Sequence, residues 1–236
     1  MADTITSTEP LRLGSEPFGV GGRRLCFTHP HALDRCVKIL RQDEGRAIRS
    51  RKSGIIPARY RRTYDNNAHE RQVLDALYKR LGEQMSQHLP RGYGAVETDR
   101  GPGLVFDLYR DFDGKISRSL RELLSTGYSL DRFRPAFEEL AAFFVEHTVL
   151  SRSLLDHNIV VRDRGDGTWR MYVIDGLGDP AWLPLARWFK SLGQAKVRRR
   201  IEEAWERFRE FEQRGGVTPE LLASSSWGQG FLNHRG

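Results

Sequence analysis

Two oxygen-bearing side chains flank a predicted β-hairpin in the second half of the chain. Residues 159–161 and 169–174 are typical strands, and the turn between them contains Asp166-Gly167. Asn158 enters the first strand and Asp175 leaves the second, so an antiparallel hairpin places these two residues close together. An amide oxygen and a carboxylate suit Mg²⁺, a hard cation that prefers oxygen ligands. The alternative is that both are ordinary turn or cap residues.

A glycine-rich turn and a strand lysine lie near the N-terminus. The segment Phe18-Gly19-Val20-Gly21-Gly22 can bring backbone N–H groups close to phosphate oxygens, as many turns of this composition can. Lys38 lies inside an apolar strand, where a lysine normally faces solvent. It gains a chemical role only beside a carboxylate. Glu70 is a candidate partner, because a helix packed on that strand brings the two side chains within ion-pair reach.

Short strands and amphipathic helices must position these residues. The predicted strands, besides the hairpin, cover residues 25–28, 36–40, 92–97 and 103–109. The predicted helices cover residues 66–81, 120–124, 131–150 and 186–213. In the third helix the apolar stripe is expected at Phe133, Phe137, Leu140, Phe144 and Thr148.

The order of these elements predicts a bilobal α+β fold, because strands with one helix precede helices with one hairpin. We predict a small β-rich N-lobe over residues 11–108 and a reduced, mainly helical C-lobe over residues 109–213. The polar residues 1–10 are expected to form a disordered tail, and the last residues, 214–236, a flexible one.

Composition narrows the class of protein. The chain has 236 residues, of which 39% are hydrophobic and 29% charged, which excludes wholesale disorder, collagen and coiled coils. No apolar run approaches the ~18 residues of a membrane span. The N-terminus has no basic and apolar segments typical of a secretory signal. Two cysteines, Cys26 and Cys36, are too few for a disulfide framework, so we expect reduced thiols and a cytoplasmic location.

A net charge of +7 raises the question of an acidic partner. Most of the excess lies in two stretches, Arg41–Arg62 and Arg187–Arg200. No helix-turn-helix, zinc-finger or RNA-binding motif accompanies them, so nucleic acid is not the favoured partner. The alternative is an arginine-rich surface exposed to solvent.

The sequence resembles the protein-kinase-like superfamily in the order of five features. These are the glycine turn, the strand lysine, the helix glutamate, the asparagine before a hairpin and the aspartate after it. More narrowly, the sequence from about residue 11 to about residue 212 resembles the bacterial YrbL family, the PhoP regulatory network proteins. The segments that carry the resemblance are GVGGRRLCFTHP and RCVKIL within 19–40, HERQVLDAL at 69–77, RGYGAVETDRGPGLVFDLYRDFDGK at 91–115, and SLLDHNIVV and VIDGLGDPAWLPL within 153–185.

The resemblance implies binding of ATP and Mg²⁺. The residues that it implies for nucleotide binding are Gly19, Gly21, Lys38, Glu70, Asp107 and Tyr109. The lysine would contact the α- and β-phosphates and pair with the glutamate, and the two glycines would belong to the loop covering the phosphates. The last two residues would belong to a hinge where backbone groups hold adenine. Asn158 and Asp175 would hold Mg²⁺.

The chain departs from the kinase-like pattern in its catalytic loop. The position of the general base, five residues before Asn158, is Ser153, and a serine hydroxyl is no useful base at neutral pH. The lysine expected two residues later is Leu155. Asp156 lies too close to Asn158 to be the missing base, and the neighbouring His157 is most simply an exposed loop histidine.

Three functions therefore remain open. The first, which we favour, is an atypical ATP-dependent phosphotransferase with a regulatory role and an unknown phosphoacceptor or protein partner, with Ser153 at the catalytic position. The second is a pseudokinase that acts as a nucleotide-dependent regulatory binding module. The third is a basic scaffold that binds nucleic acid or anionic surfaces.

Overall fold

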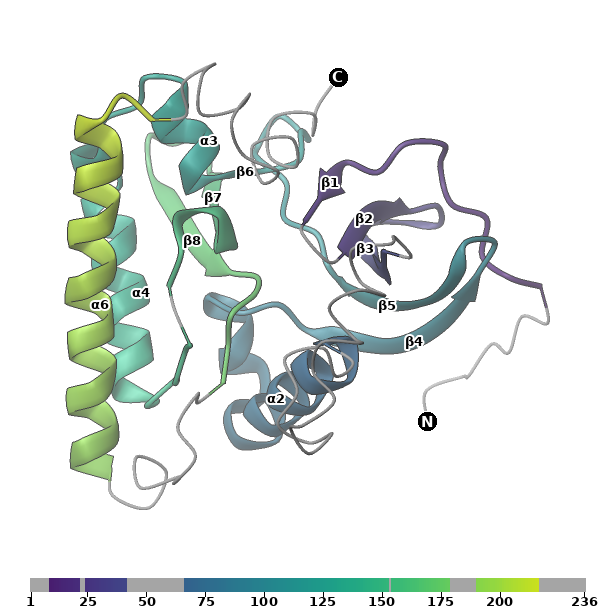
Figure 1. Cartoon of the computed structure of the whole chain (residues 1–236), viewed down its shortest axis with the longest axis horizontal. Coiled ribbons are helices and arrows are strands. Elements are labelled where there is room, and N and C mark those ends of the chain that lie inside the picture. Colours follow the sequence, from purple (N-terminus) through teal and green to yellow (C-terminus); the bar gives the residue numbers. More distant parts are fainter. Residues whose placement is uncertain (1–8, 22–23, 42–65, 153, 179–189, 217–236) are drawn as a thin grey trace, which may run out of the picture.

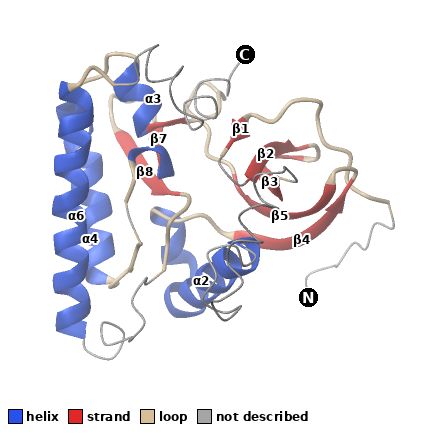
Figure 2. Cartoon of the chain, in the orientation of Figure 1, coloured by secondary structure: helices blue, strands red, loops and turns tan. Residues whose placement is uncertain are grey.

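The computed structural model describes residues 9–21, 24–41, 66–152, 154–178 and 190–216, and these form an α+β fold (Figures 1 and 2). The N-terminal part is a five-stranded antiparallel sheet with strand order β1-β2-β3-β5-β4. Its strands are β1 (Gly19–Val20), β2 (Arg24–His29), β3 (Ala32–Leu40), β4 (Gly92–Thr98) and β5 (Gly101–Asp107).

Helix α2 (Asn66–Leu81) lies between β3 and β4 in the sequence and has the bounds that the apolar spacing predicts. Its buried residues Leu74 and Leu77 face the core. At its end Gly82 takes a left-handed conformation, with φ of 58°, and the chain continues as the 3₁₀ helix η2 (Gly82–Gln87). Glu70 is thereby held on the first half of a helix docked beside the sheet.

The second part of the chain combines a small sheet with helices. The strands β6 (Arg118–Ser119), β7 (Ile159–Asp163) and β8 (Trp169–Val173) form an antiparallel sheet in that order. The helical segments are α3 (Leu120–Ser125), η3 (Leu130–Phe133), α4 (Arg134–Glu146), η4 (Asp156–Asn158) and α6 (Lys190–Gln213). Helix α4 packs between β8 and α6, with α4 and α6 side by side at the left of Figure 1.

The predicted helix over residues 131–150 is too long. Its α-helical part ends at Glu146, and Thr148 has a positive φ of 47°, a conformation that reverses the chain. Val149 N–H then donates to the Phe144 carbonyl, which closes the helix end. Phe133, Phe137, Leu140 and Phe144 are buried as predicted, but Thr148 is not part of this stripe.

The two faces of the five-stranded sheet belong to different clusters because strand residues alternate in direction. Val37 and Ile39 of β3 pack in a small cluster together with Leu13 and Phe27. Cys36, one residue away, belongs to the large core that continues into the helices. Residues at even positions of β3, Lys38 included, therefore face the rest of the molecule.

His88 joins the two parts of the chain. A carbonyl oxygen can only accept a hydrogen bond, so the buried His88 ring donates its Nδ1–H to the Met171 carbonyl at 2.9 Å. The His88 carbonyl in turn accepts from Val173 N–H at 2.9 Å. Burial of the ring lowers the pKa of His88, so it is neutral in this position. Strand β8 is thus anchored to the segment that follows α2.

The structure also bears on the predictions about the cysteines, membrane spans and basic stretches. Cys26 and Cys36 are both free thiols, as predicted. Within the described ranges no helix has the length and apolar character needed to cross a bilayer. The basic stretch 41–62 lies outside the described residues apart from Arg41, and Arg199 and Arg200 in the second basic stretch pair with Glu203.

Candidate functional site

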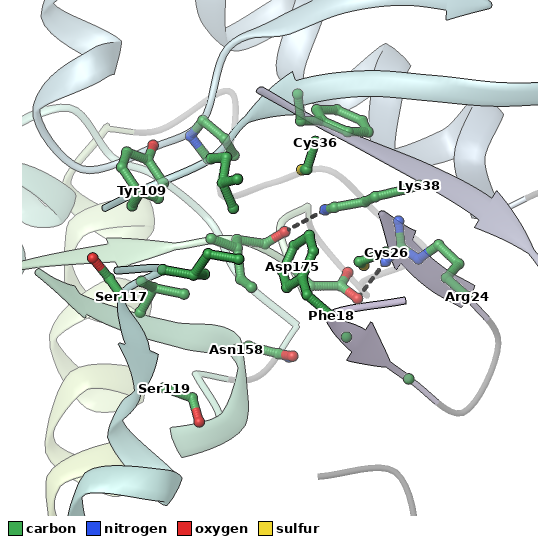
Figure 3. A pocket seen from close by; sticks show the side chains of 18 of the residues that line it. Phe18, Arg24, Cys26, Cys36, Lys38, Tyr109, Ser117, Ser119, Asn158 and Asp175 are labelled. Atoms are coloured by element: carbon green, nitrogen blue, oxygen red, sulfur yellow. Dashed lines mark hydrogen bonds and ion pairs between the residues drawn. The ribbon is translucent and has the colours of Figure 1, made fainter. Parts of the chain in front are cut away.

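A cavity of about 240 Å³ lies between the five-stranded sheet and the β6–β8 part of the chain (Figure 3). The sheet contributes the first wall, in which Arg24, Cys26, Cys36 and Lys38 share one face of β2 and β3. The opposite wall comes from the segments around β6, η4 and the end of β8. These walls bring the predicted nucleotide and metal residues to one place, apart from Glu70, which does not line the cavity but pairs with Lys38.

Lys38 and Glu70 form the ion pair that the sequence predicted. Lys38 Nζ lies 2.9 Å from Glu70 Oε1 and donates a second hydrogen bond to the Ile174 carbonyl at 3.0 Å. Both side chains are buried. Burial lowers the pKa of Lys38, and the neighbouring charge of Arg24 lowers it further. The carboxylate of Glu70 fixes the direction of the ammonium group at the edge of the cavity.

Arg24 is part of this site, and the sequence analysis missed it. One guanidinium nitrogen pairs with Glu70 Oε2. Another, Nη2, pairs with Asp175 Oδ2, as Figure 3 shows. The signal that could have found it is the alternation of side chains along a strand. Cys26 of β2 is opposite Lys38 of β3, and Arg24 lies two residues before Cys26, so all three side chains are on the same face of the sheet. Two cations and two carboxylates therefore meet at this end of the cavity.

Asn158 and Asp175 come together at the end of the β7–β8 hairpin, as predicted. Ile174 N–H donates to the Asn158 carbonyl at 2.9 Å, and both Asn158 and Asp175 line the cavity. Gly176 N–H donates to Asp175 Oδ1 at 2.6 Å, and the Asp175 side chain is 45% exposed. Burial raises the pKa of Asp175, but the charges of Arg24 and Lys38 outweigh it and lower the pKa to about 2.

The donor set of the hairpin end is small. No group of three or more His, Cys, Asp or Glu side chains in the described part of the chain could hold a metal ion. One carboxylate and one amide facing a cavity fit Mg²⁺, which keeps several waters and binds through one or two carboxylates plus the phosphates of a substrate. They do not fit a closed structural metal site, which needs about four protein ligands.

A second arginine holds the turn that carries Asn158. Arg121 donates to Asp156 with two hydrogen bonds of 2.7 Å, Nε to Oδ2 and Nη2 to Oδ1, and both side chains are buried. Burial raises the pKa of Asp156, but hydrogen bonds from His157 and Arg121 lower it to about 2. Asp156 is therefore an ionised structural group. Ser153, the position of the missing base, lies outside the described residues.

The two predicted hinge residues, Asp107 and Tyr109, also line the cavity. The Asp107 carboxylate accepts hydrogen bonds from Tyr93 Oη at 2.8 Å and from Arg91 N–H at 2.7 Å. The Tyr109 ring stacks on Tyr172 of β8, with centroids 3.7 Å apart. Their side chains are thus engaged with the protein. Part of their backbone is engaged as well, since Asp107 N–H donates to the Arg91 carbonyl and the Tyr109 carbonyl accepts from Ser117 N–H.

The remaining lining residues combine a glycine turn with apolar side chains. Gly19 packs so tightly on Cys26 that an added Cβ would lie 3.2 Å from the cysteine Cβ, and Gly21 N–H closes the turn onto the Arg24 carbonyl. The apolar lining includes Phe18, Phe106, Ile116, Val160 and Ile174, and part of it lies against the charged groups, since Lys38 Nζ is 4.5 Å from the centroid of the Phe106 ring. His157 lines the cavity as well, so it is not a freely exposed loop residue. A flat apolar group beside a polyanion suits such a shape.

The comparison with known proteins agrees with the resemblance carried by the sequence motifs. The family model described as "PhoP regulatory network protein YrbL" matches residues 13–211. Relatives named YrbL from Escherichia coli (strain K12) and Shigella flexneri are each 29% identical over 204 residues, which cover 84% of this chain and 86% of each relative. From residue 13 to residue 211, the chain is a member of the YrbL family.

Proposed function

We propose that this chain is an ATP- and Mg²⁺-binding protein of the protein-kinase-like fold that acts as an atypical phosphotransferase with a regulatory role. One observation carries the proposal. Lys38, Asn158 and Asp175 come from distant parts of the sequence and line one cavity, and Glu70, from a further part, pairs with the lysine. A structural ion pair alone needs no cavity and no facing amide, whereas phosphoryl transfer needs a cation, metal ligands and room for a nucleotide.

Each residue of the site has a defined task in this proposal. Lys38, held by Glu70, binds phosphate oxygens, and the turn around Gly19 and Gly21 brings backbone N–H groups over them. Asn158 and Asp175 hold Mg²⁺, which supplies neutralisation of phosphate charge when bound. The apolar side chains of the cavity lining receive the base, beside the backbone of residues 107–109.

The order of elements supports the same fold. A five-stranded antiparallel sheet carries a glycine turn on its first strands, a lysine on its third and a helix before its fourth. A hairpin with asparagine and aspartate at its open end follows among helices. The regulatory part of the proposal comes from the family description, which names a PhoP regulatory network.

Calorimetric titration of ATP into the full chain, with and without Mg²⁺, tests the binding step. Lys38→Ala removes a charge-assisted contact of about 1.5–3 kcal/mol, so we expect binding about tenfold or more weaker in both conditions. Asp175→Ala is expected to remove the effect of Mg²⁺ on binding. Arg71→Ala, a change at a half-exposed α2 residue paired with Asp75, serves as the matched control. Absence of binding by the unaltered chain at millimolar ATP would refute the proposal.

A second function, nucleotide binding without turnover, is favoured by the state of Asp156. This carboxylate is the one nearest in sequence to Asn158 on its loop, and the double hydrogen bond from Arg121 keeps it from acting as a base. Release of phosphate or label transfer from γ-labelled ATP separates the two functions. An enzyme yields product that disappears in Asp175→Ala, whereas a binding module yields none at any enzyme concentration.

A further inference from the structure

Arg24 occupies the place in the cavity where the proposed metal ion needs a ligand. Its Nη2 pairs with Asp175 Oδ2, while Asp175 Oδ1 accepts from Gly176 N–H (Figure 3). Both carboxylate oxygens of Asp175 are therefore engaged. A metal ion that binds Asp175 in the usual way must compete with the guanidinium for Oδ2.

The local charges are balanced in this arrangement. Lys38 and Arg24 supply two positive charges, and Glu70 and Asp175 supply two negative ones. A divalent cation that enters alone meets the guanidinium at short range, and a triphosphate that enters alone meets two carboxylates. Each ligand by itself brings a charge that nothing offsets, whereas a metal ion offsets part of the charge of a polyphosphate when the two enter together.

We propose that Arg24 is an exchangeable counter-ion, which neutralises Asp175 in the empty cavity and turns to the phosphates when metal and nucleotide bind. This inference rests on the proposed function and adds to it a second phosphate-binding cation. It also assigns to Arg24 the coupling between binding of the metal ion and binding of the nucleotide. By linkage, if the nucleotide raises the affinity for the metal ion, the metal ion raises the affinity for the nucleotide by the same factor.

The position and chemistry of Arg24 fit this exchange. Arg24 lines the cavity directly after the turn that contains Gly19 and Gly21, where phosphate oxygens are proposed to lie. A guanidinium presents several N–H donors in a plane that matches phosphate as well as carboxylate. Glu70 keeps Lys38 as a partner when Arg24 turns away, so the exchange leaves no buried carboxylate without a cation.

The test measures each ligand separately in Arg24→Gln. Mn²⁺ alone is titrated by the loss of its free-ion paramagnetic resonance signal, and a fluorescent ATP analogue is titrated alone in the presence of EDTA. We expect Mn²⁺ to bind the variant at least about tenfold more tightly than the unaltered chain, and the nucleotide to bind at least about tenfold more weakly. Opposite changes are the signature of an exchangeable counter-ion.

The outcomes separate this inference from the function on which it rests. Arg71→Gln removes the same charge from the surface of α2 and is expected to leave both affinities within about twofold. If the unaltered chain binds the Mn²⁺–nucleotide complex but Arg24→Gln leaves both single-ligand affinities unchanged, or moves them in the same direction, Arg24 is a structural ion pair and the inference is wrong. If the unaltered chain binds neither the nucleotide nor its Mn²⁺ complex, the proposed function fails and the inference fails with it.

The folding of Arg24→Gln is checked by circular dichroism and thermal melting. A second variant, Arg24→Lys, tests the inference independently. Arg24→Lys keeps the charge, but a single ammonium group cannot bridge two carboxylates as the guanidinium does. We expect Mn²⁺ alone to bind Arg24→Lys more tightly than the unaltered chain and less tightly than Arg24→Gln. Equal Mn²⁺ affinity in the lysine variant and the unaltered chain would contradict the bridging role.

Discussion

Arg121 and Arg24 both hold carboxylates in the interior of this chain, and they do so in different surroundings. Arg121 donates a hydrogen bond to each carboxylate oxygen of Asp156, and the two side chains are 8% and 7% exposed. Arg24 divides its guanidinium between Glu70 and Asp175, and Asp175 is 45% exposed on the cavity side. The Arg121–Asp156 pair is closed within the protein, and so is the contact of Arg24 with Glu70, whose side chains are 10% and 8% exposed. Only the contact of Arg24 with Asp175 is open to whatever enters the cavity.

The difference teaches how ion pairs of one chemical type take on different tasks. A buried pair with all its lone pairs satisfied is expensive to break, because each partner is left charged in a poor solvent. A pair at a cavity wall exchanges partners at lower cost, since water or a ligand replaces the lost contact. We therefore assign Arg121 to the shape of the Asn158 turn and Arg24 to the chemistry of the cavity.

Removal of Arg121 is expected to have the largest effect on stability. Arg121→Ala leaves the Asp156 carboxylate buried without its double hydrogen bond, which costs about 3–5 kcal/mol of unfolding free energy. Urea denaturation measures the loss. Arg214→Ala, which removes an arginine from an exposed pair with Glu210, is the control and is expected to change stability by less than about 1 kcal/mol. A similar loss of unfolding free energy in the two variants would contradict the larger contribution expected of the buried pair.

Lowering the pH is expected to lower the unfolding free energy through the Arg121–Asp156 pair. The pKa of Asp156 is about 2 in the folded chain and 3.8 in its ordinary state, so the ionised form stabilises the fold above pH 3.8. That contribution, about 2 kcal/mol, is lost as the pH falls from about 4 to about 2.

Urea denaturation at several pH values between 5 and 2.5 checks this expectation. The unfolding free energy of Asp156→Asn should fall less steeply with acid than that of the unaltered chain. Asp175→Asn should change the slope less than Asp156→Asn, because solvent screens the half-exposed Asp175 carboxylate. Parallel curves for the unaltered chain and Asp156→Asn would contradict the assignment.

Removal of Arg24 is expected to lower stability less than removal of Arg121. Arg24→Gln leaves Glu70 paired with Lys38 and Asp175 in contact with solvent, so the unfolding free energy should fall by about 1 kcal/mol. Thermal or urea denaturation measures it on the same samples used for ligand binding. A loss as large as that of Arg121→Ala would mean that Arg24 is mainly structural.

Local periodicity was enough to predict most elements of the fold. The helix predicted over residues 66–81 coincides with α2, and its buried residues Leu74 and Leu77 lie three apart, because a helix that packs on one face repeats its buried positions every three to four residues. The end of α4 could not be predicted in this way. Thr148 adopts the left-handed conformation that glycine usually supplies, so no breaker residue marks the stop.

The site was predictable wherever a single element or a short turn sets the distance. The hairpin alone brings Asn158 beside Asp175, since only its own register is involved. Arg24 depends on the pairing of β2 with β3, which contains an irregularity between Thr28 and His29. A shift of register by one residue moves a side chain to the other face of a sheet, so spacing along the sequence could not place Arg24 in the cavity.

The anchoring of β8 has a consequence for the movements of the molecule. Three hydrogen bonds tie the end of β8 to the first half of the chain: His88 Nδ1 to the Met171 carbonyl, Val173 N–H to the His88 carbonyl, and Lys38 Nζ to the Ile174 carbonyl. A wide rotation of one wall away from the other would break all three at once. Ligand exchange is therefore expected to proceed through nanosecond-to-microsecond rearrangements of side chains and the glycine turn, with the radius of gyration unchanged.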